Sequence, residues 1–289
     1  MKVFMTGATG FTGSRIVPKI LQEGYPLHCL VRKTSDLSGL PADVIQHVGD
    51  LNDLPGLIQA MKGCDTLVNT ASLGFGHAAN IVEAAQAAGI QRAVFLSTTA
   101  IFTHLNSKSK KVRLDAEEII QKSSLDFTIL RPTMIYGSQR DRNMSRLIKW
   151  LKTIPIAPIF GSGTYLQQPI FVDDVAQAVI QCLHKPATIG KTYNIAGLNA
   201  LTYNQVIDTI SQQMGRKILK LFINHHNLVK FLRFFERLKI SLPIKAEQVM
   251  RLNENKDFSI MDAQRDFDYR PLSFAEGIQL ELTALKTGR

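Results

Sequence analysis

A glycine-rich turn lies near the start of the chain, between an apolar run and an amphipathic segment. Gly7, Gly10 and Gly13 follow the apolar residues 3–5, and an apolar-periodic segment continues from Ile16. Glycines at this spacing permit a tight turn, close backbone approach to a pyrophosphate and close packing of a helix on a strand. The N–H groups at the start of that helix can then bind phosphate oxygens. The order of strand, turn and helix predicts a dinucleotide-binding site.

The first two hundred residues alternate short apolar runs with helical patterns. We expect strands at residues 2–6, 28–31, 44–48, 66–69, 93–97 and 126–130, and helices at 14–23, 53–61, 76–89 and 114–123. Such alternation predicts a parallel sheet with right-handed crossovers and helices on both faces. The fold class is therefore α/β, a doubly wound parallel Rossmann sheet over residues 1–200. Residues 201–289 are mostly helical in pattern and predict a small C-terminal lobe for substrate or partner.

The glycine turn and several later segments resemble one enzyme superfamily. Gly-x-x-Gly-x-x-Gly with Thr6 ahead of it is similar to the turn of the short-chain dehydrogenase/reductase superfamily. Residues 130–137, 171–176 and 193–197 resemble signatures of its extended, epimerase-like branch. The resemblance implies that NAD(P) is bound by Thr6, Gly7, Thr9, Gly10, Phe11, Gly13, Asp50, Leu51, Thr70, Ala71, Ser72, Ser97 and Pro132.

The end of the second expected strand indicates which dinucleotide is preferred. An acidic residue there would bind the ribose 2′-hydroxyl of NAD, whereas a basic residue accommodates the 2′-phosphate of NADP. The chain has Arg32, Lys33 and Ser35 at this place, and the nearest acid, Asp36, lies beyond it. A guanidinium can bind phosphate through two hydrogen bonds. The sequence therefore predicts NADP(H) in preference to NAD(H), unless the two cations are ordinary surface charges.

The catalytic signature of the superfamily is missing. That signature is a Tyr followed four residues later by a Lys, and none of the six tyrosines has a Lys at this spacing. Thr99, with Thr98 as second choice, matches the hydroxyl that contacts the substrate. The departure resembles the atypical group of the superfamily, which includes NmrA-like regulators, isoflavone-reductase-like enzymes that use a Lys, and the accessory subunit of respiratory complex I.

A basic segment stands where the Tyr would be, and it contains Lys108, Lys110 and Lys111. One of these lysines would supply the proton if burial beside other cations lowers its pKa. The other interpretation is a solvated loop. His104 is a second candidate donor, although a single His in such a loop is more often structural. Because positioning contributes more to hydride transfer than a general acid does, loss of the Tyr weakens carbonyl reduction without forbidding it.

Two functions follow from these observations. The first is an NADP(H)-dependent atypical reductase or nucleotide-sugar-epimerase-like oxidoreductase that acts on a small molecule with a non-standard proton donor. The net charge of +10 would favour an acidic substrate. The alternative is a non-catalytic cofactor-binding protein, either a redox sensor or an assembly factor at a membrane surface.

Residues 216–256 carry ten basic and three acidic residues, and they include an amphipathic segment at 228–238. Leu228, Phe231, Leu232, Phe235 and Leu238 share one helical face in this segment. That face either covers the substrate cleft or binds a membrane surface or a protein partner. Nucleic acid is disfavoured as a partner, because no known reading module is present and the basic residues alternate with core-type residues.

The remaining features indicate a cytoplasmic protein without a metal site. Cys29, Cys64 and Cys182 are isolated from one another and from histidines, which is typical of buried thiols in a reducing compartment. No apolar run is long enough to span a bilayer. Met1 and Lys2 lead directly into the first expected strand, so we expect no signal peptide before it.

Overall fold

The computed structural model describes residues 1–105, 108–141, 143–238, 240 and 245–287. A seven-stranded sheet lies at its centre, with all strands parallel and in the order β11-β6-β5-β4-β1-β2-β3. The strands are β1 (Val3–Thr6), β2 (Leu27–Val31), β3 (Ile45–Val48), β4 (Thr66–Asn69), β5 (Arg92–Leu96), β6 (Asp126–Pro132) and β11 (Lys191–Ile195). The predicted doubly wound α/β fold is confirmed.

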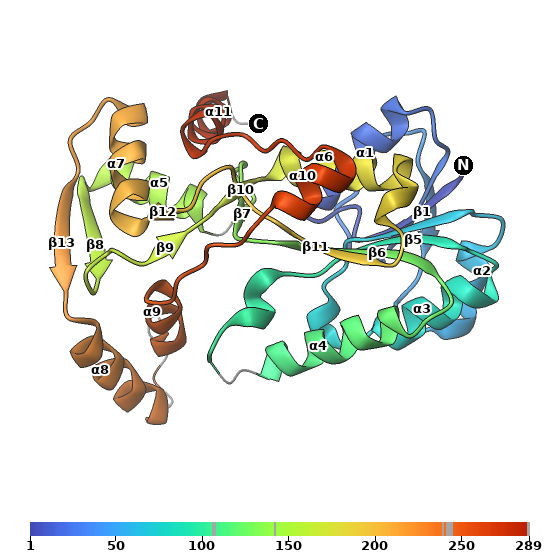
Figure 1. Cartoon of the computed structure of the whole chain (residues 1–289), viewed down its shortest axis with the longest axis horizontal. Helices are drawn as coiled ribbons and strands as arrows, with labels where there is room; N and C mark the ends of the chain where they lie inside the picture. Colours follow the sequence, from blue (N-terminus) through green and yellow to red (C-terminus); the bar gives the residue numbers. More distant parts are fainter. Residues whose placement is uncertain (106–107, 142, 239, 241–244, 288–289) are drawn as a thin grey trace.

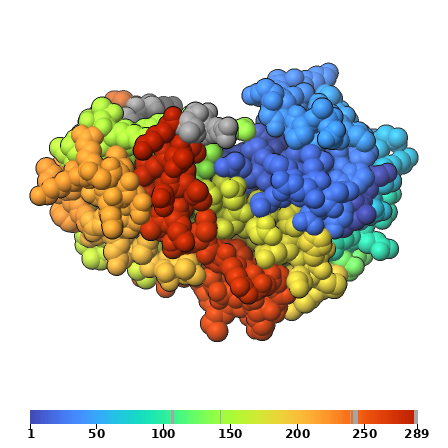
Figure 2. Space-filling model, turned by 90° about the horizontal axis from the view of Figure 1, so that it is seen from above, coloured from blue at the N-terminus to red at the C-terminus, as the bar shows by residue number. Residues whose placement is uncertain are grey.

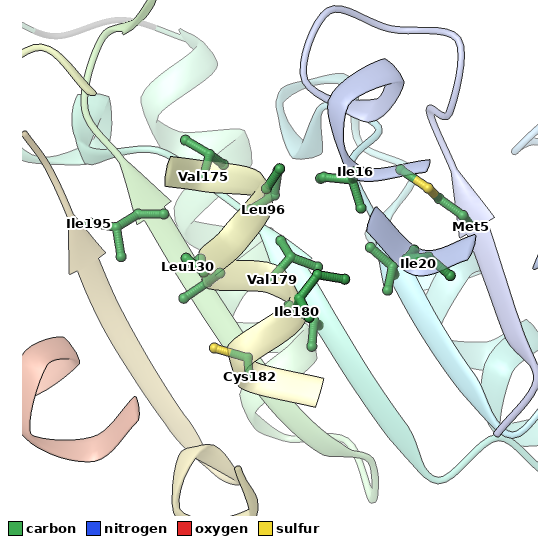
Figure 3. Packing of buried hydrophobic residues seen from close by; sticks show 14 of the residues in the cluster. Met5, Ile16, Ile20, Leu96, Leu130, Val175, Val179, Ile180, Cys182 and Ile195 are labelled. Carbon is green, nitrogen blue, oxygen red and sulfur yellow. The ribbon is translucent and has the colours of Figure 1, made fainter. Parts of the chain in front are cut away.

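Helices cover both faces of this sheet (Figure 1). One face carries α2 (Leu54–Met61), α3 (Ala78–Ala87) and α4 (Lys108–Gln121), and the other carries α1 (Gly13–Gln22), α6 (Val172–His184) and α10 (Met261–Phe267). Figure 3 shows how the second face packs, with Ile16 and Ile20 of α1 and Val175 of α6 in one buried cluster with residues of the strands. The strand order turns back between β1 and β4, and in such sheets a ligand binds outside the strand ends at this point.

Helix α4 begins earlier than the sequence predicts. The expected helix covered residues 114–123, whereas α4 starts at Lys108, so the lysines expected in a loop form its first turn. Basic side chains are unfavourable at a helix N-terminus because of the helix dipole. The sequence therefore did not predict a helical turn at these lysines. Two side-chain hydrogen bonds support this turn. Lys110 Nζ donates to the Thr103 carbonyl at 2.7 Å, and Arg113 Nη1 donates to the Ser109 carbonyl at 3.2 Å.

A second lobe lies beside the sheet and has its own hydrophobic core. It contains α5 (Met144–Thr153), α7 (Tyr203–Met214), α11 (Phe274–Thr287) and the parallel pair β8 (Ile156–Phe160) and β13 (Leu219–Ile223). Both sides of residue 200 contribute to this core, and α10 returns to the Rossmann sheet. A single boundary at residue 200 therefore does not separate the two cores. In Figure 2, α11 (red) lies on the side of this lobe that is nearer the N-terminal part of the chain (blue).

Short elements complete the chain. They are β7 (Ile135–Tyr136), β9 (Leu166–Gln167), β10 (Ile170–Phe171), β12 (Leu201–Thr202), the 3-10 turns η1 (Leu73–Phe75), η2 (Thr99–Phe102) and η3 (Pro186–Thr188), and the helices α8 (His225–Arg237) and α9 (Ala246–Leu252). Helices α8 and α9 share a small core of their own. In the described ranges, no helix is long and apolar enough to cross a bilayer.

Replacing Leu130 with Ala should destabilise the protein by about 2–5 kcal/mol, because it leaves a cavity in the core between β6 and α6. The matched control is Leu280→Ala on α11, where the side chain is 49% exposed. The control should change the unfolding free energy by no more than about 0.5 kcal/mol. Urea unfolding measures both values, and similar losses in the two variants would contradict the assignment of Leu130 to the core.

Candidate functional site

A cavity of about 690 Å³ opens at the carboxyl ends of β1, β2 and β4, where the strand order turns back. Many of the residues predicted to bind the dinucleotide line it: Thr6, Gly7, Thr9, Gly10, Phe11, Arg32, Ser35, Asp50, Leu51, Thr70, Ala71 and Ser72. Further lining comes from Leu30, Gly49, Phe75, His77, Ile135, Arg140, Asp141 and Asn143. The structure thus gathers segments far apart in the sequence around one concave site.

The glycine turn forms the floor of this cavity and has no room for side chains. Gly7 has a φ of +75°, and a Cβ there would lie 2.6 Å from Thr70 Oγ1. A Cβ on Gly13 would clash with the carbonyl oxygen of Gly7 and would lie 2.9 Å from Ala8 Cα. The Gly10 N–H donates to the Gly7 carbonyl at 3.0 Å, which closes the turn. The turn therefore presents bare backbone and the start of α1 to the cavity, which fits a bound pyrophosphate.

Hydrogen bonds between neighbouring strand ends hold the floor in place. Thr6 Oγ1 donates to Asn69 Oδ1 at 2.6 Å, and Thr70 Oγ1 donates to the Thr6 carbonyl at 2.8 Å. These bonds join the ends of β1 and β4 beside the glycine turn. Since Thr6 and Asn69 are buried, their polar groups need these partners. The threonine ahead of the first glycine thus stabilises the site from below.

The end of β2 supplies positive charge to one wall. Arg32 and Ser35 line the cavity, and the Arg32 N–H donates to Ser35 Oγ at 3.1 Å. Asp36 Oδ1 accepts from the Ser38 N–H at 3.0 Å and does not line the cavity. Lys33 is exposed and is likewise not a lining residue. Of the predicted pair of cations, only Arg32 faces the site.

The loop after β3 continues the wall beside the end of β2. Asp50 Oδ1 accepts from the backbone and side-chain N–H groups of Asn52, both at 2.8 Å, and these bonds lower the pKa of Asp50. The Leu51 carbonyl accepts from Asn80 Nδ2 of α3 at 2.9 Å. Both residues therefore have fixed positions at the edge of the cavity.

Arg140 is a cavity residue that the sequence did not indicate. It follows β7, and its Nη2 atom donates to the Thr9 carbonyl in the glycine turn at 2.7 Å. Asp141 and Asn143, which follow it, also line the cavity. No pattern in the sequence connects residue 140 with residue 9, because their contact arises only when the second lobe folds back over the sheet. Arg140 adds a second guanidinium beside the phosphate-binding turn.

Ser97 and Pro132 are not among the cavity-lining residues. Ser97 Oγ donates to Glu117 of α4, and Glu117 also accepts two hydrogen bonds from Arg131 Nε at 3.0 and 3.1 Å. Glu117 is buried, and Arg131 Nη2 is in direct ion contact with it. The Pro132 carbonyl accepts from Thr99 Oγ1 at 3.3 Å. These groups form a polar network beneath the strand ends, next to the cavity.

The residues predicted to act in catalysis lie around η2 and the start of α4. Thr98 Oγ1 accepts from the Ala100 N–H at 3.1 Å, and Thr99 is buried. His104 is exposed, and its backbone N–H donates to Glu254 Oε1 at 3.0 Å. Lys108 and Lys111 are exposed, whereas Lys110 is half-buried and donates to the Thr103 carbonyl. None of them is among the residues that line the cavity.

Lys256 is a cationic residue that the sequence analysis missed. It is half-buried between the lobes, and its Nζ atom donates to Gln167 Oε1 at 3.2 Å and to the Arg251 carbonyl. Burial lowers the pKa of Lys256 to about 8, and Arg251 lowers it further while Glu254 opposes the shift. Glu254 bonds Thr103 Oγ1 at 2.7 Å, so this segment contacts η2 directly. Only the tertiary contact reveals this lysine, since no motif marks it.

The described residues contain no group of three or more His, Cys, Asp or Glu side chains arranged to hold a metal ion. The three cysteines are buried free thiols, and burial raises the pKa of Cys29 and Cys182 to about 12. These thiols are therefore protonated and unreactive near neutral pH.

Comparison with known families agrees with this geometry. A family model described as NAD(P)H-binding matches residues 7–186, which include the glycine turn and every described cavity-lining residue except Thr6. The chain belongs to this NAD(P)H-binding family. The predicted resemblance to the extended and atypical short-chain dehydrogenases is also confirmed, because relatives and structural neighbours include reductases and sugar epimerases.

The proteins that resemble this chain differ in the activity or role that their names state. The chain is 25% identical to isoflavone reductase of Pisum sativum, covering 93% of this chain and 95% of the relative. It is 26% identical to the photosystem II assembly factor Ycf39 of Guillardia theta, covering 94% and 90%. UDP-glucuronic acid 4-epimerase of Bacillus cereus, solved with NAD, has the same fold, with a TM-score of 0.78, 18% identity and coverage of 99% of both chains.

Gly13→Ala should weaken NADPH binding at least about tenfold, because the added methyl group must displace the Gly7 carbonyl and shift the turn. Gly39→Ala is the matched control, since a Cβ at Gly39 meets nothing within 4 Å. Isothermal titration calorimetry measures both dissociation constants. Equal affinities in the two variants would show that the turn does not form the binding site.

Proposed function

We propose that the protein is an NADP(H)-dependent reductase of a small molecule with a non-standard proton donor. The observation that carries this proposal is the cavity at the turn-back of the sheet, with bare glycine backbone on its floor and Arg32 in its wall. When bound, NADPH supplies a hydride. The isoflavone reductase relative supports a reductase, and the UDP-sugar epimerases among the structural neighbours make an epimerase-like oxidoreductase its nearest variant.

The preference for NADP(H) rests on the charge of the cavity wall. Arg32 and Ser35 follow β2, where the 2′-substituent of the adenosine ribose is recognised in this type of sheet. Asp36, the nearest acid, accepts a hydrogen bond from Ser38 instead of lining the wall. An exposed guanidinium can bind a 2′-phosphate with two parallel hydrogen bonds. A 2′-hydroxyl has only one oxygen and cannot accept both of them. Arg140 adds positive charge near the same turn.

Arg32→Asp should raise the dissociation constant of NADPH roughly 10–100-fold, because a charge-assisted bond to the phosphate contributes about 1.5–3 kcal/mol. NADH should lose much less affinity. Lys33→Asp makes the same charge change one residue later, outside the cavity wall, and should affect both cofactors little. Calorimetric titration of the three proteins with both cofactors tests the proposal, and equal losses for NADPH and NADH would refute the specificity argument.

The proton donor in this proposal is a lysine, because the chain lacks the Tyr of the superfamily. Thr98 and Thr99 would orient the reacting oxygen, and a cationic side chain would donate the proton. Lys110 is held beside Thr103, and Lys256 lies two residues after Glu254, which accepts a hydrogen bond from Thr103 Oγ1. A general acid works best when its pKa lies near the working pH. Lys256, with a pKa of about 8, meets this condition.

If Lys256 donates the proton, kcat/KM for NADPH-dependent reduction of an aromatic aldehyde should fall as pH rises through about 8. The sign follows from the lowered pKa, because only the protonated ammonium below that pH can donate. Lys256→Arg keeps the positive charge with a much higher pKa and should remove this step from the pH profile. Lys111→Arg, on the exposed side of α4, is the control. A wild-type profile without a step near pH 8 would exclude Lys256.

A second function is favoured by one observation. The hydroxyls of Ser97 and Thr99 donate to protein acceptors, Thr98 accepts from the backbone, and the superfamily's Tyr is absent. A site built this way suits a cytoplasmic cofactor-binding redox sensor or assembly factor, and the Ycf39 relative supports that alternative. Titration with NADP⁺ and NADPH distinguishes the two. Similar affinity for both with turnover of carbonyls or quinones supports the reductase, whereas strong preference for one redox state without turnover supports the sensor.

A further inference from the structure

Helix α8 has two apolar stripes, and only one of them is covered. Val229 and Leu232 are buried against α9 in a small core. Phe231 and Phe234, one and two residues away from Leu232, are 53% and 58% exposed. Leu238 continues this outer stripe and is 54% exposed. Large apolar side chains exposed together on one helix are unusual on a protein that contacts only water.

The apolar face predicted for residues 228–238 is only partly buried. Leu232 of the predicted face is buried, whereas Phe231 and Leu238 of the same face are exposed. The physical reason is that α9 is a helix of seven residues and covers only a narrow strip of α8. Phe234 was not assigned to the face, but it forms an edge-on ring pair with Phe235 at 5.6 Å, and Phe231 packs on Phe235 at 4.7 Å. The three rings form one aromatic cluster.

Positive charge accompanies the outer stripe. Lys230, Arg233 and Arg237 are exposed on α8, and none of them is in an ion pair with another described residue. The only acid of α8, Glu236, accepts from the Ala246 N–H at 3.0 Å and is thereby tied to α9. The outer side of the helix therefore combines aromatic side chains with exposed cations, although Arg233 Nη2 also donates to Met250 Sδ of α9 at 3.4 Å.

Strand β13 leads directly into α8 and is apolar on its surface as well. Leu219, Leu221 and Phe222 are exposed, and β13 pairs with β8 on one side only. Figure 1 shows β13 and α8 together at the end of the molecule farthest from the N-terminal strands. A helix at the tip of a lobe can meet a flat surface without obstruction from the rest of the protein.

We infer that the outer side of α8 is a docking surface for an anionic lipid bilayer. We call it the α8 surface, made of Phe231, Phe234, Leu238, Lys230, Arg233 and Arg237. Amphipathic helices of this kind lie in the bilayer interface, with aromatic side chains among the lipid chains and basic side chains at anionic headgroups. Binding would not require a spanning helix, and α8 would lie parallel to the membrane plane.

Charge selects the bilayer over a second copy of the chain. Two copies meeting through the α8 surface would bring Lys230, Arg233 and Arg237 close to the same residues of the other copy, and like charges at short range oppose association. An anionic headgroup layer instead neutralises all three. The α8 surface is also separate from the cofactor site, because the described residues that line the cavity all fall within residues 6–143. Membrane binding and cofactor binding can therefore be measured independently.

Flotation of the full chain with lipid vesicles tests the inference. The wild type should float with vesicles of phosphatidylglycerol and phosphatidylcholine and much less with pure phosphatidylcholine. Phe231→Glu/Phe234→Glu should abolish flotation, and Lys230→Ala/Arg237→Ala should lower the partition coefficient at least about tenfold at low salt. Met261→Glu is the matched control, since Met261 of α10 is 73% exposed and lies outside the α8 surface. The control should float like the wild type.

Thermal melting and NADPH titration of each variant show whether the variant is folded. The melting curve reports folding even if the protein does not bind NADPH. Three results would overturn the inference: no flotation of the wild type, equal flotation with both vesicle types, or equal flotation of the Phe variant and the wild type. A wild-type dimer that Phe231→Glu/Phe234→Glu converts to a folded monomer would also overturn it, because the stripe would then be an interface between copies.

Discussion

The rest of the structure depends on the close packing of α1 against the turn that follows β1. The absence of a Cβ at Gly13 lets the helix start against the Gly7 carbonyl, and this contact fixes the direction of α1 over the sheet. From there Ile16 and Ile20 pack into the core that α1 shares with α6. The same contact turns the helix N-terminus toward the cavity, so one steric condition serves both the core and the cofactor site.

Buried polar groups beside this site are satisfied by one another. Glu117 is held by Ser97 and Arg131, and Arg131 also lies over the Phe102 ring with 5.3 Å between the guanidinium carbon and the ring centroid. A buried carboxylate is tolerated only when such partners are complete, so this network is a rigid base under the strand ends. The cations that remain outside it, Lys110 and Lys256, lie near the contact between the two lobes.

The two lobes divide the chemistry of the molecule. Residues of the Rossmann sheet supply backbone donors and a guanidinium around a concave site, which suits a charged small molecule. The far end of the second lobe has exposed aromatic rings and exposed cations on a helix that is supported by only a small core. Because the two surfaces share no residue, both can be occupied at the same time. This separation would let a cofactor-binding protein work at a membrane surface.

Local sequence patterns determined the sheet, its order of strand and helix, and most of the cavity wall. Glycine spacing and apolar periodicity act over a few residues, so they are readable without the fold. Contacts between distant segments could not be read this way. Arg140 donates a hydrogen bond to the Thr9 carbonyl, and burial lowers the pKa of Lys256. Helix α9 covers one apolar stripe of α8 but not the other. Tertiary structure alone fixed these features, because burial and charge proximity depend on which surfaces meet.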